Sequence, residues 1–131
     1  MIPARVRDEI VRHARDEQPN ESCGLLVLCD GVADRYERGV NAAASPYRFE
    51  LHMDDPEVWF LEDAGFELAV VHSHVSSPPR PSRTDVQNIG MWGRKPYVIY
   101  TVRTDELAAW RIHSGAIEQL PMRDHADHDT T

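Results

Sequence analysis

The stretch ELAVVHSHVSSPPRPSRTD, residues 67–85, decides how this chain folds, because its character changes twice within one short segment. The apolar residues up to Val71 predict a buried strand that ends in His72-Ser73-His74. Three prolines then interrupt strand pairing, since proline has no N–H to donate. Ser82-Arg83-Thr84-Asp85 has the pattern of a helix start. The stretch therefore predicts a strand, a stiff loop and a helix, as in an α/β domain.

The two histidines at the end of this strand are two residues apart, so their side chains project from the same face. Their backbones are roughly 7 Å apart, which lets one ring nitrogen of each reach a shared ion at about 2.0–2.1 Å. Asp85, at the start of the next helix, could supply a third ligand. Two imidazoles and one carboxylate with an open position are typical of catalytic rather than structural zinc.

The same residues also have interpretations that need no metal. A histidine at the end of a strand is usually just hydrogen-bonded. Ser82-x-x-Asp85 is a helix capping box, with Asp85 in the favourable first turn of the helix. From these residues alone, capping is the favoured role of Ser82 and Asp85. Their spacing therefore allows a metal site without establishing one.

Apolar periodicity elsewhere predicts further helices and strands around one mixed sheet. Asp30-Gly31 is a hairpin signal between two of the strands. The predicted helices are residues 3–17, 55–65 and 83–92, and the predicted strands are residues 24–29, 32–40, 47–51, 67–74, 97–102, 107–112 and 116–120. They predict one α/β domain of two or three layers over residues 1–121. Residues 122–131 lack an apolar period and predict a disordered polar tail, in which solvation rather than metal binding is expected of His125, Asp127 and His128.

The composition limits the classes of partner. Fourteen basic and 22 acidic residues give a net charge of −8, which disfavours binding to nucleic acid. No stretch of about 18 apolar residues and no apolar signal-peptide centre is present, so we expect a cytoplasmic protein that does not enter a membrane. Cys23 and Cys29 fall on one predicted strand, roughly 20 Å apart and beyond disulfide reach. We expect two reduced, mostly buried thiols.

Two separated motifs together resemble the JAMM (MPN-domain) zinc metalloproteases. His72-Ser73-His74, seven residues, Ser82, two residues and Asp85 is similar to the H-S/T-H…S-x-x-D signature of that family. Upstream, Glu21-Ser22-Cys23-Gly24 resembles its E-x-C-G element. The likeness extends in outline from residue 3 to about residue 120. It implies an MPN-domain architecture, similar to cytidine deaminases, with a mixed β-sheet packed by helices.

The resemblance implies a role for each matching residue. His72, His74 and Asp85 would bind one Zn²⁺ per chain, with a water at the fourth position. Glu21 would accept the proton of that water and deliver it to the leaving amine. Ser82 would donate a hydrogen bond to the tetrahedral oxyanion, a role compatible with capping.

Residues near the motif residues are expected to be structural. Cys23 is expected to pack beneath the site, and Ser73 to point away from the two histidines. Trp59, Trp92 and Trp110 are expected in the core rather than on a substrate platform.

The resemblance is greatest to small bacterial members that act on ubiquitin-like sulfur-carrier proteins. It implies hydrolysis of the amide bond after a C-terminal Gly-Gly, for instance to release a C-terminal cysteine in cysteine biosynthesis. The alternative is a non-catalytic MPN scaffold, which typically lacks one or more motif residues, whereas all five are present here. A zinc deaminase needs H-x-E and P-C-x-x-C, and neither occurs. The residues do not indicate an oligomeric state.

Overall fold

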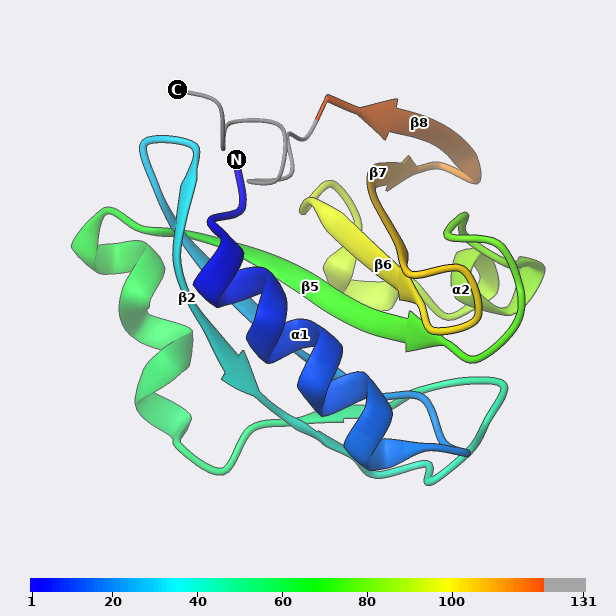
Figure 1. Cartoon of the computed structure of the whole chain (residues 1–131). Coiled ribbons are helices and arrows are strands. Elements are labelled where there is room, and N and C mark those ends of the chain that lie inside the picture. The colour runs from blue at the N-terminus through cyan, green and yellow to red at the C-terminus, as the bar shows by residue number, and fades with distance from the viewer. Residues whose placement is uncertain (122–131) are drawn as a thin grey trace.

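A six-stranded mixed sheet with helices on both faces forms the body of the molecule, as the computed structural model shows for residues 1–121 (Figure 1). The tail predicted for residues 122–131 lies outside the described residues. The elements are α1 (Ala4–Glu17), β1 (Cys23–Cys29), β2 (Val32–Arg38), β3 (Val40–Asn41), β4 (Leu51–His52), η1 (Pro56–Ala64), β5 (Glu67–His74), α2 (Arg83–Gln87), η2 (Gly90–Trp92), β6 (Tyr97–Thr101), β7 (Glu106–His113) and β8 (Ala116–Leu120).

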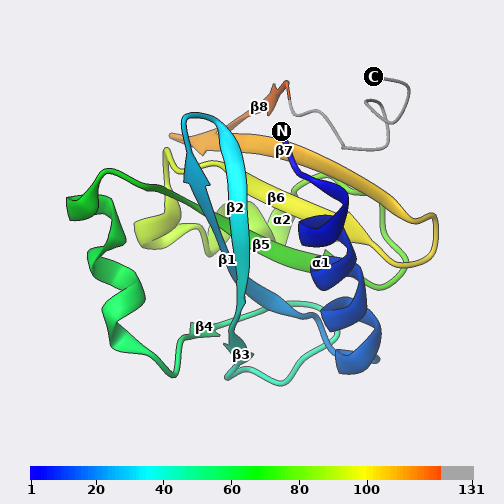
Figure 2. The same cartoon turned by 60° about the vertical axis from the view of Figure 1, so that its left-hand side comes forward.

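The sheet has the order β2-β1-β5-β6-β7-β8. Only β5 and β6 run parallel, and their connection carries the proline-rich loop, α2 and η2. All other neighbouring strands pair antiparallel. A second pair, β3 and β4, lies at the end of the sheet where β1 begins (Figure 2). The predicted fold class, a mixed sheet packed by helices, is confirmed.

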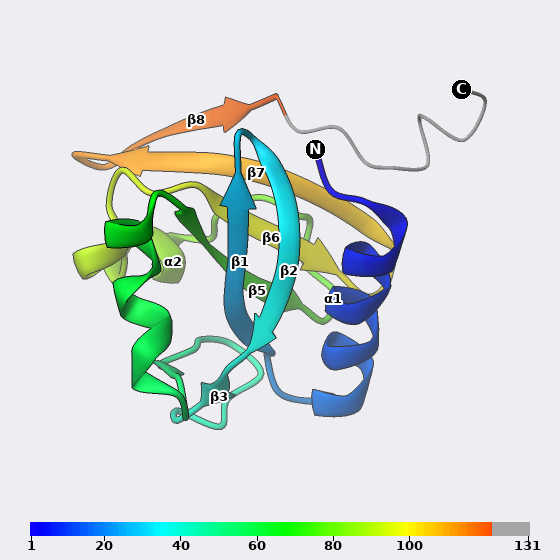
Figure 3. The same cartoon turned by 90° about the vertical axis from the view of Figure 1, so that its left-hand side faces the viewer.

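The two faces of the sheet carry separate apolar clusters, because strand side chains alternate. Val6 and Ile10 of α1 pack against one face, which includes Val71 of β5. The other face, which includes Val70, is covered by η1, α2 and η2, so the domain has three layers (Figure 3). The same alternation continues into His72-Ser73-His74. It directs both histidines away from α1.

Two predicted strands are wrong in part, because part of their backbone forms hydrogen bonds other than those predicted. Residues 47–50 are not a strand: the Arg48 carbonyl accepts from Asn41 Nδ2, and the Glu50 N–H donates to Asn41 Oδ1. Only Leu51–His52 pairs, with Val40–Asn41, so the strand predicted to continue to residue 40 ends at Arg38.

Two predicted helices also differ from the prediction. The helix predicted at residues 55–65 is present as Pro56–Ala64, with Gly65 at its C-cap, but it is a 3₁₀ helix whose one buried side chain is that of Val58. An apolar face that narrow offers little of the packing that sustains most α-helices. The helix predicted at residues 83–92 stops at Gln87, and a separate 3₁₀ turn, η2, begins at Gly90, whose φ of 47° lies in the left-handed region.

One cysteine and two tryptophans are more exposed than predicted. Both thiols are free, and Cys23 is buried, but Cys29 is exposed because it ends β1 beside the hairpin turn. Trp110 is a core residue as predicted, whereas Trp59 is 37% exposed and stacks on half-buried Trp92. Within residues 1–121, no helix is long and apolar enough to cross a membrane.

A buried histidine links α1 to β2. The Tyr36 hydroxyl lies 2.7 Å from His13 Nδ1, and both side chains are buried. Burial, together with the positive charge of Arg38, lowers the pKa of His13 to about 4, while Asp16 acts in the opposite direction. His13 is therefore neutral at pH 7, and its Nδ1 shares a hydrogen bond with the tyrosine hydroxyl.

We expect His13 to destabilise the protein in acid. Its pKa is about 4 when folded and 6.5 ordinarily, so the unfolded chain binds more protons between these values. Stability should therefore be lost as the pH falls from about 6.5 to about 4, by up to roughly 3 kcal/mol. Urea unfolding across this range should show a flatter profile for His13→Asn than for the wild type. The control His52→Asn removes an exposed histidine and should keep the wild-type profile. If the unfolding free energy of His13→Asn depends on pH as steeply as that of the wild type, His13 is not the group responsible.

Candidate metal centre

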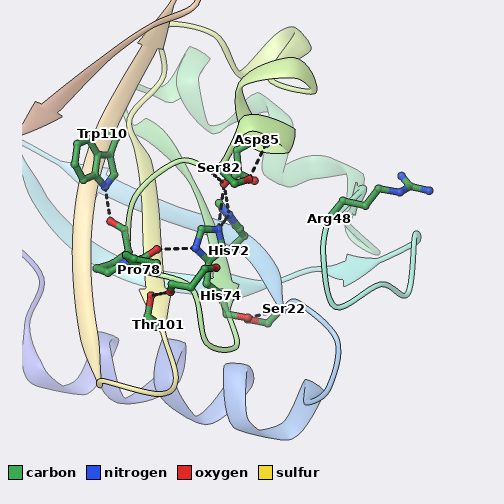
Figure 4. Close-up of polar contacts among 12 residues, drawn as sticks. Ser22, Arg48, His72, His74, Pro78, Ser82, Asp85, Thr101 and Trp110 are labelled. Atoms are coloured by element: carbon green, nitrogen blue, oxygen red, sulfur yellow. Dashed lines mark hydrogen bonds and ion pairs between the residues drawn. The ribbon is translucent and has the colours of Figure 1, made fainter.

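Three potential metal ligands meet where β5 ends and α2 begins. His72 Nε2 lies 3.2 Å from His74 Nε2, and Asp85 Oδ2 lies 3.3 Å from the first and 3.1 Å from the second (Figure 4). All three residues are buried. The structure thus brings together the three side chains that the sequence singled out as ligands.

The triangle of donor atoms has the dimensions that a tetrahedral ion requires. Bonds of about 2.0–2.1 Å at tetrahedral angles place ligand atoms about 3.3–3.4 Å apart, against 3.1–3.3 Å here. An ion bound by these three atoms would keep a fourth position free for another ligand. Two imidazole nitrogens and one carboxylate oxygen suit zinc.

The charges of the three groups favour a cation. Burial lowers the pKa of His72, which keeps a lone pair available on its ring. Burial alone would raise the pKa of Asp85, but hydrogen bonds with His72 and His74 hold it far below its ordinary value. Burial disfavours protonated His74 too, yet its hydrogen bonds to Asp85 and the Pro78 carbonyl raise its pKa. The centre therefore places a carboxylate beside two imidazole nitrogens, a set of donors that can bind a metal ion.

Asp85 caps helix α2 and also belongs to the group of three potential metal ligands. The Ser82 N–H donates to Asp85 Oδ2 at 2.9 Å, and the Asp85 N–H donates to Ser82 Oγ at 3.0 Å, which completes the capping box. The oxygen that caps α2 is the one nearest both histidines. Because Ser82 Oγ accepts in the box, its hydrogen remains available for another acceptor.

Glu21 reaches this region through the antiparallel pairing of β1 with β5. Cys23 is the register partner of His72, so the start of β1 lies beside the end of β5. Glu21 lies two residues before β1, and the charges of both His74 and Asp85 act on its carboxyl group. The Ser22 N–H donates to Ser73 Oγ at 2.8 Å, which confirms the structural role predicted for Ser73.

The carboxyl group of Glu21 is almost fully enclosed, at 3% exposure. Its pKa is raised to about 8, chiefly by burial; the charge of His74 lowers the pKa and that of Asp85 raises it. Among the described residues, the buried side-chain atoms without a hydrogen-bond partner are Glu21 Oε1 and His72 Nδ1. Both belong to this centre. Such unsatisfied groups are typical of a functional site.

Asn41 supports the segment that carries Glu21, a role that the sequence analysis did not assign to it. Its Nδ2 donates to the carbonyls of Glu21 and Arg48, each at 3.0 Å, and its Oδ1 accepts from the N–H groups of Ala43 and Glu50 at 3.0 Å. One buried amide thus ties Glu21 to the following loop. No local pattern reveals such a set of partners.

A cavity of about 300 Å³ opens beside the centre, with Asp85 in its wall. Phe49 stacks on the His72 ring with centroids 4.6 Å apart, and Tyr97 lies 5.0 Å from that ring. Both aromatic residues line the cavity, as does Trp92, for which only a core position was predicted. The cavity therefore joins an aromatic wall to a candidate metal ligand.

A mixed sheet of this kind with a buried His-His-Asp group is typical of the JAMM metalloprotease-like proteins. The chain belongs to the prokaryotic homologs of the JAB domain, whose family model matches residues 3–113. The resemblance seen in the sequence is thereby confirmed.

Individual relatives agree with this assignment. The chain is 34% identical to the CysO-cysteine peptidase of Mycobacterium tuberculosis, over 93% of this chain and 88% of that protein. A solution structure of a protein from Desulfitobacterium hafniense superposes with a TM-score of 0.75 at 23% identity, covering 99% of this chain and 97% of the other. A JAB1/MPN domain protein from Archaeoglobus fulgidus gives 0.61 at 19%, covering 93% and 95%. These two structures support the fold.

Proposed function

We propose that this protein is a zinc-dependent peptidase that cleaves the amide bond after the C-terminal Gly-Gly of a ubiquitin-like sulfur-carrier protein and releases a C-terminal cysteine. The observation that carries the proposal is the buried triangle of His72, His74 and Asp85 with an open fourth corner. Similarity over nearly the whole length to a CysO-cysteine peptidase supports the substrate. A cytoplasmic location, suited to cysteine biosynthesis, is part of the proposal.

His72 and His74 would hold zinc through Nε2, and Asp85 through Oδ2. When bound, the ion polarises the scissile carbonyl and makes hydroxide available near neutral pH. The His74 Nδ1–H donates to the Pro78 carbonyl at 2.8 Å, which fixes the ring so that Nε2 faces the ion. Glu21 takes up the proton of the attacking water and later passes it to the leaving amine. Its buried position and raised pKa suit a group that must gain and lose a proton near neutral pH.

Ser82 would stabilise the oxyanion. Its Oγ already accepts from the Asp85 N–H, so the hydroxyl is held by the backbone while its hydrogen can point at a substrate oxygen. The capping box therefore orients both Ser82 and Asp85. A non-catalytic scaffold would need neither the buried, unpaired carboxyl oxygen of Glu21 nor an open metal corner.

The substrate proposal predicts that zinc-loaded protein shortens a carrier ending in Gly-Gly-Cys by one residue. Intact-mass spectrometry of the carrier would show the loss of cysteine and no further trimming into Gly-Gly. A carrier that already ends in Gly-Gly is the control and should keep its mass. If carriers with different C-terminal extensions all stay intact while zinc is bound, the substrate class is wrong.

A further inference from the structure

The loop between β5 and α2, residues 75–81, joins the two histidines to Asp85. It contains three prolines, so it has few N–H groups with which to satisfy its own carbonyls. Three consecutive carbonyls, those of Ser77, Pro78 and Pro79, accept from side chains of the sheet, and that of Pro78 also accepts from the Arg80 N–H within the loop (Figure 4). The loop is thus held against the strands by side chains outside it.

The three donors come from three neighbouring strands. Thr101 Oγ1 on β6 donates to the Ser77 carbonyl at 2.9 Å, and His74 Nδ1 on β5 donates to the Pro78 carbonyl at 2.8 Å. Trp110 Nε1 on β7 donates to the Pro79 carbonyl at 2.8 Å. We call this set of three hydrogen bonds the carbonyl clamp. One of its members is a candidate zinc ligand.

The sheet register explains why these donors share a face. Thr101 is the parallel register partner of His74, so the two side chains project together. Trp110 is the partner of Tyr97, which faces the same apolar cluster. The strands therefore present the clamp donors in fixed positions.

The two clamp donors other than His74 are buried side chains. Thr101 is fully buried and Trp110 is 7% exposed. The Arg80 guanidinium lies 5.4 Å above the Trp110 ring, which adds a cation–π contact between the loop and the same indole. The loss of either donor would leave a carbonyl unpaired at the base of the loop. Such a loss favours movement of the loop.

We propose that Thr101 and Trp110 are positioning residues for the metal centre, a role that rests on the zinc site proposed above. They touch neither the ion nor the substrate. They hold the loop where the Pro78 carbonyl can orient the His74 ring and where α2 can bring Asp85 back to the histidines. Mutation of residues that orient the ligands of a metal typically lowers its affinity by about 10–100-fold.

The test is the zinc affinity of metal-free protein, measured by competition with a chromophoric chelator. Thr101→Val keeps the side-chain shape but removes the donor, and Trp110→Phe keeps a ring but removes the N–H. Each should weaken zinc binding about 10-fold. Thr101→Ser keeps the hydroxyl, and Trp59→Phe changes a tryptophan on η1, away from the clamp. Both should stay within about twofold of the wild type.

A measurement on the wild type covers the case in which the donor-less variants do not fold. Coupling between two sites is reciprocal, so zinc must stabilise the clamp as much as the clamp stabilises zinc. Zinc should therefore slow hydrogen exchange of the Trp110 indole N–H about 10-fold and leave that of Trp59 unchanged. Unchanged Trp110 exchange, or variants with wild-type affinity, overturns the inference while the zinc site stands. Wild-type protein that binds no zinc overturns the proposed function itself.

Discussion

Glu21→Gln is expected to abolish peptide hydrolysis, with a loss on the order of a thousandfold in kcat/KM, while zinc remains bound. The amide keeps the shape of the side chain but cannot take the proton of the attacking water. Because burial already favours the neutral form of Glu21, the neutral amide should fit without loss of stability. Activity on the carrier, zinc content and the thermal midpoint are measured on the same preparation.

The matched control is Glu67→Gln, which changes an exposed carboxylate at the opposite end of β5. It should retain full activity. An active Glu21→Gln protein would show that the proton is carried by another group. An inactive one that has also lost zinc or unfolded would assign Glu21 a structural role instead.

His72→Ala/His74→Ala is expected to reduce zinc from about one ion per chain to none, and activity with it, because two of three ligands are lost. In wild-type protein, zinc at a hundred times its Kd should add about 2.7 kcal/mol to the unfolding free energy, and a chelator should remove it. The double variant should show no effect of chelator. Asp85→Asn, a smaller change that retains an oxygen to cap α2, should weaken zinc binding without unfolding the chain.

The control for the zinc prediction is His52→Ala/His113→Ala, which removes two exposed histidines from β4 and β7. Its zinc content should match that of the wild type. Unchanged zinc in His72→Ala/His74→Ala would place the ion elsewhere, with the histidines of residues 122–131 as the next candidates.

The strand that carries the site was predictable because its signals are local. The apolar run predicts a strand, in which alternating side chains place His72 and His74 on one face, and the capping pattern places Asp85 at a helix start. The position of Glu21 could not be predicted from local signals, because it depends on the pairing of β1 with β5. Only the family resemblance linked the motif that contains Glu21 to the motif that contains the two histidines. A pairing between distant strands leaves no mark in residue spacing.

The failures and omissions have a common physical cause. The strand predicted at residues 47–51 was wrong because a buried side chain, that of Asn41, takes hydrogen bonds that a neighbouring strand would otherwise make. Thr101 and Trp110 appeared to be ordinary strand residues, since their partners are carbonyls of a distant loop. Side-chain to backbone bonds of this kind become visible only when the chain is folded.

Zinc-edge X-ray absorption of the purified, metal-loaded protein tests the central claim most directly, because it reports which atoms surround the ion. We expect one zinc per chain with two imidazole nitrogens and oxygen ligands at about 2.0–2.2 Å. Sulfur at about 2.3 Å, which would implicate Cys23, or a chain that retains no zinc after loading, would contradict it.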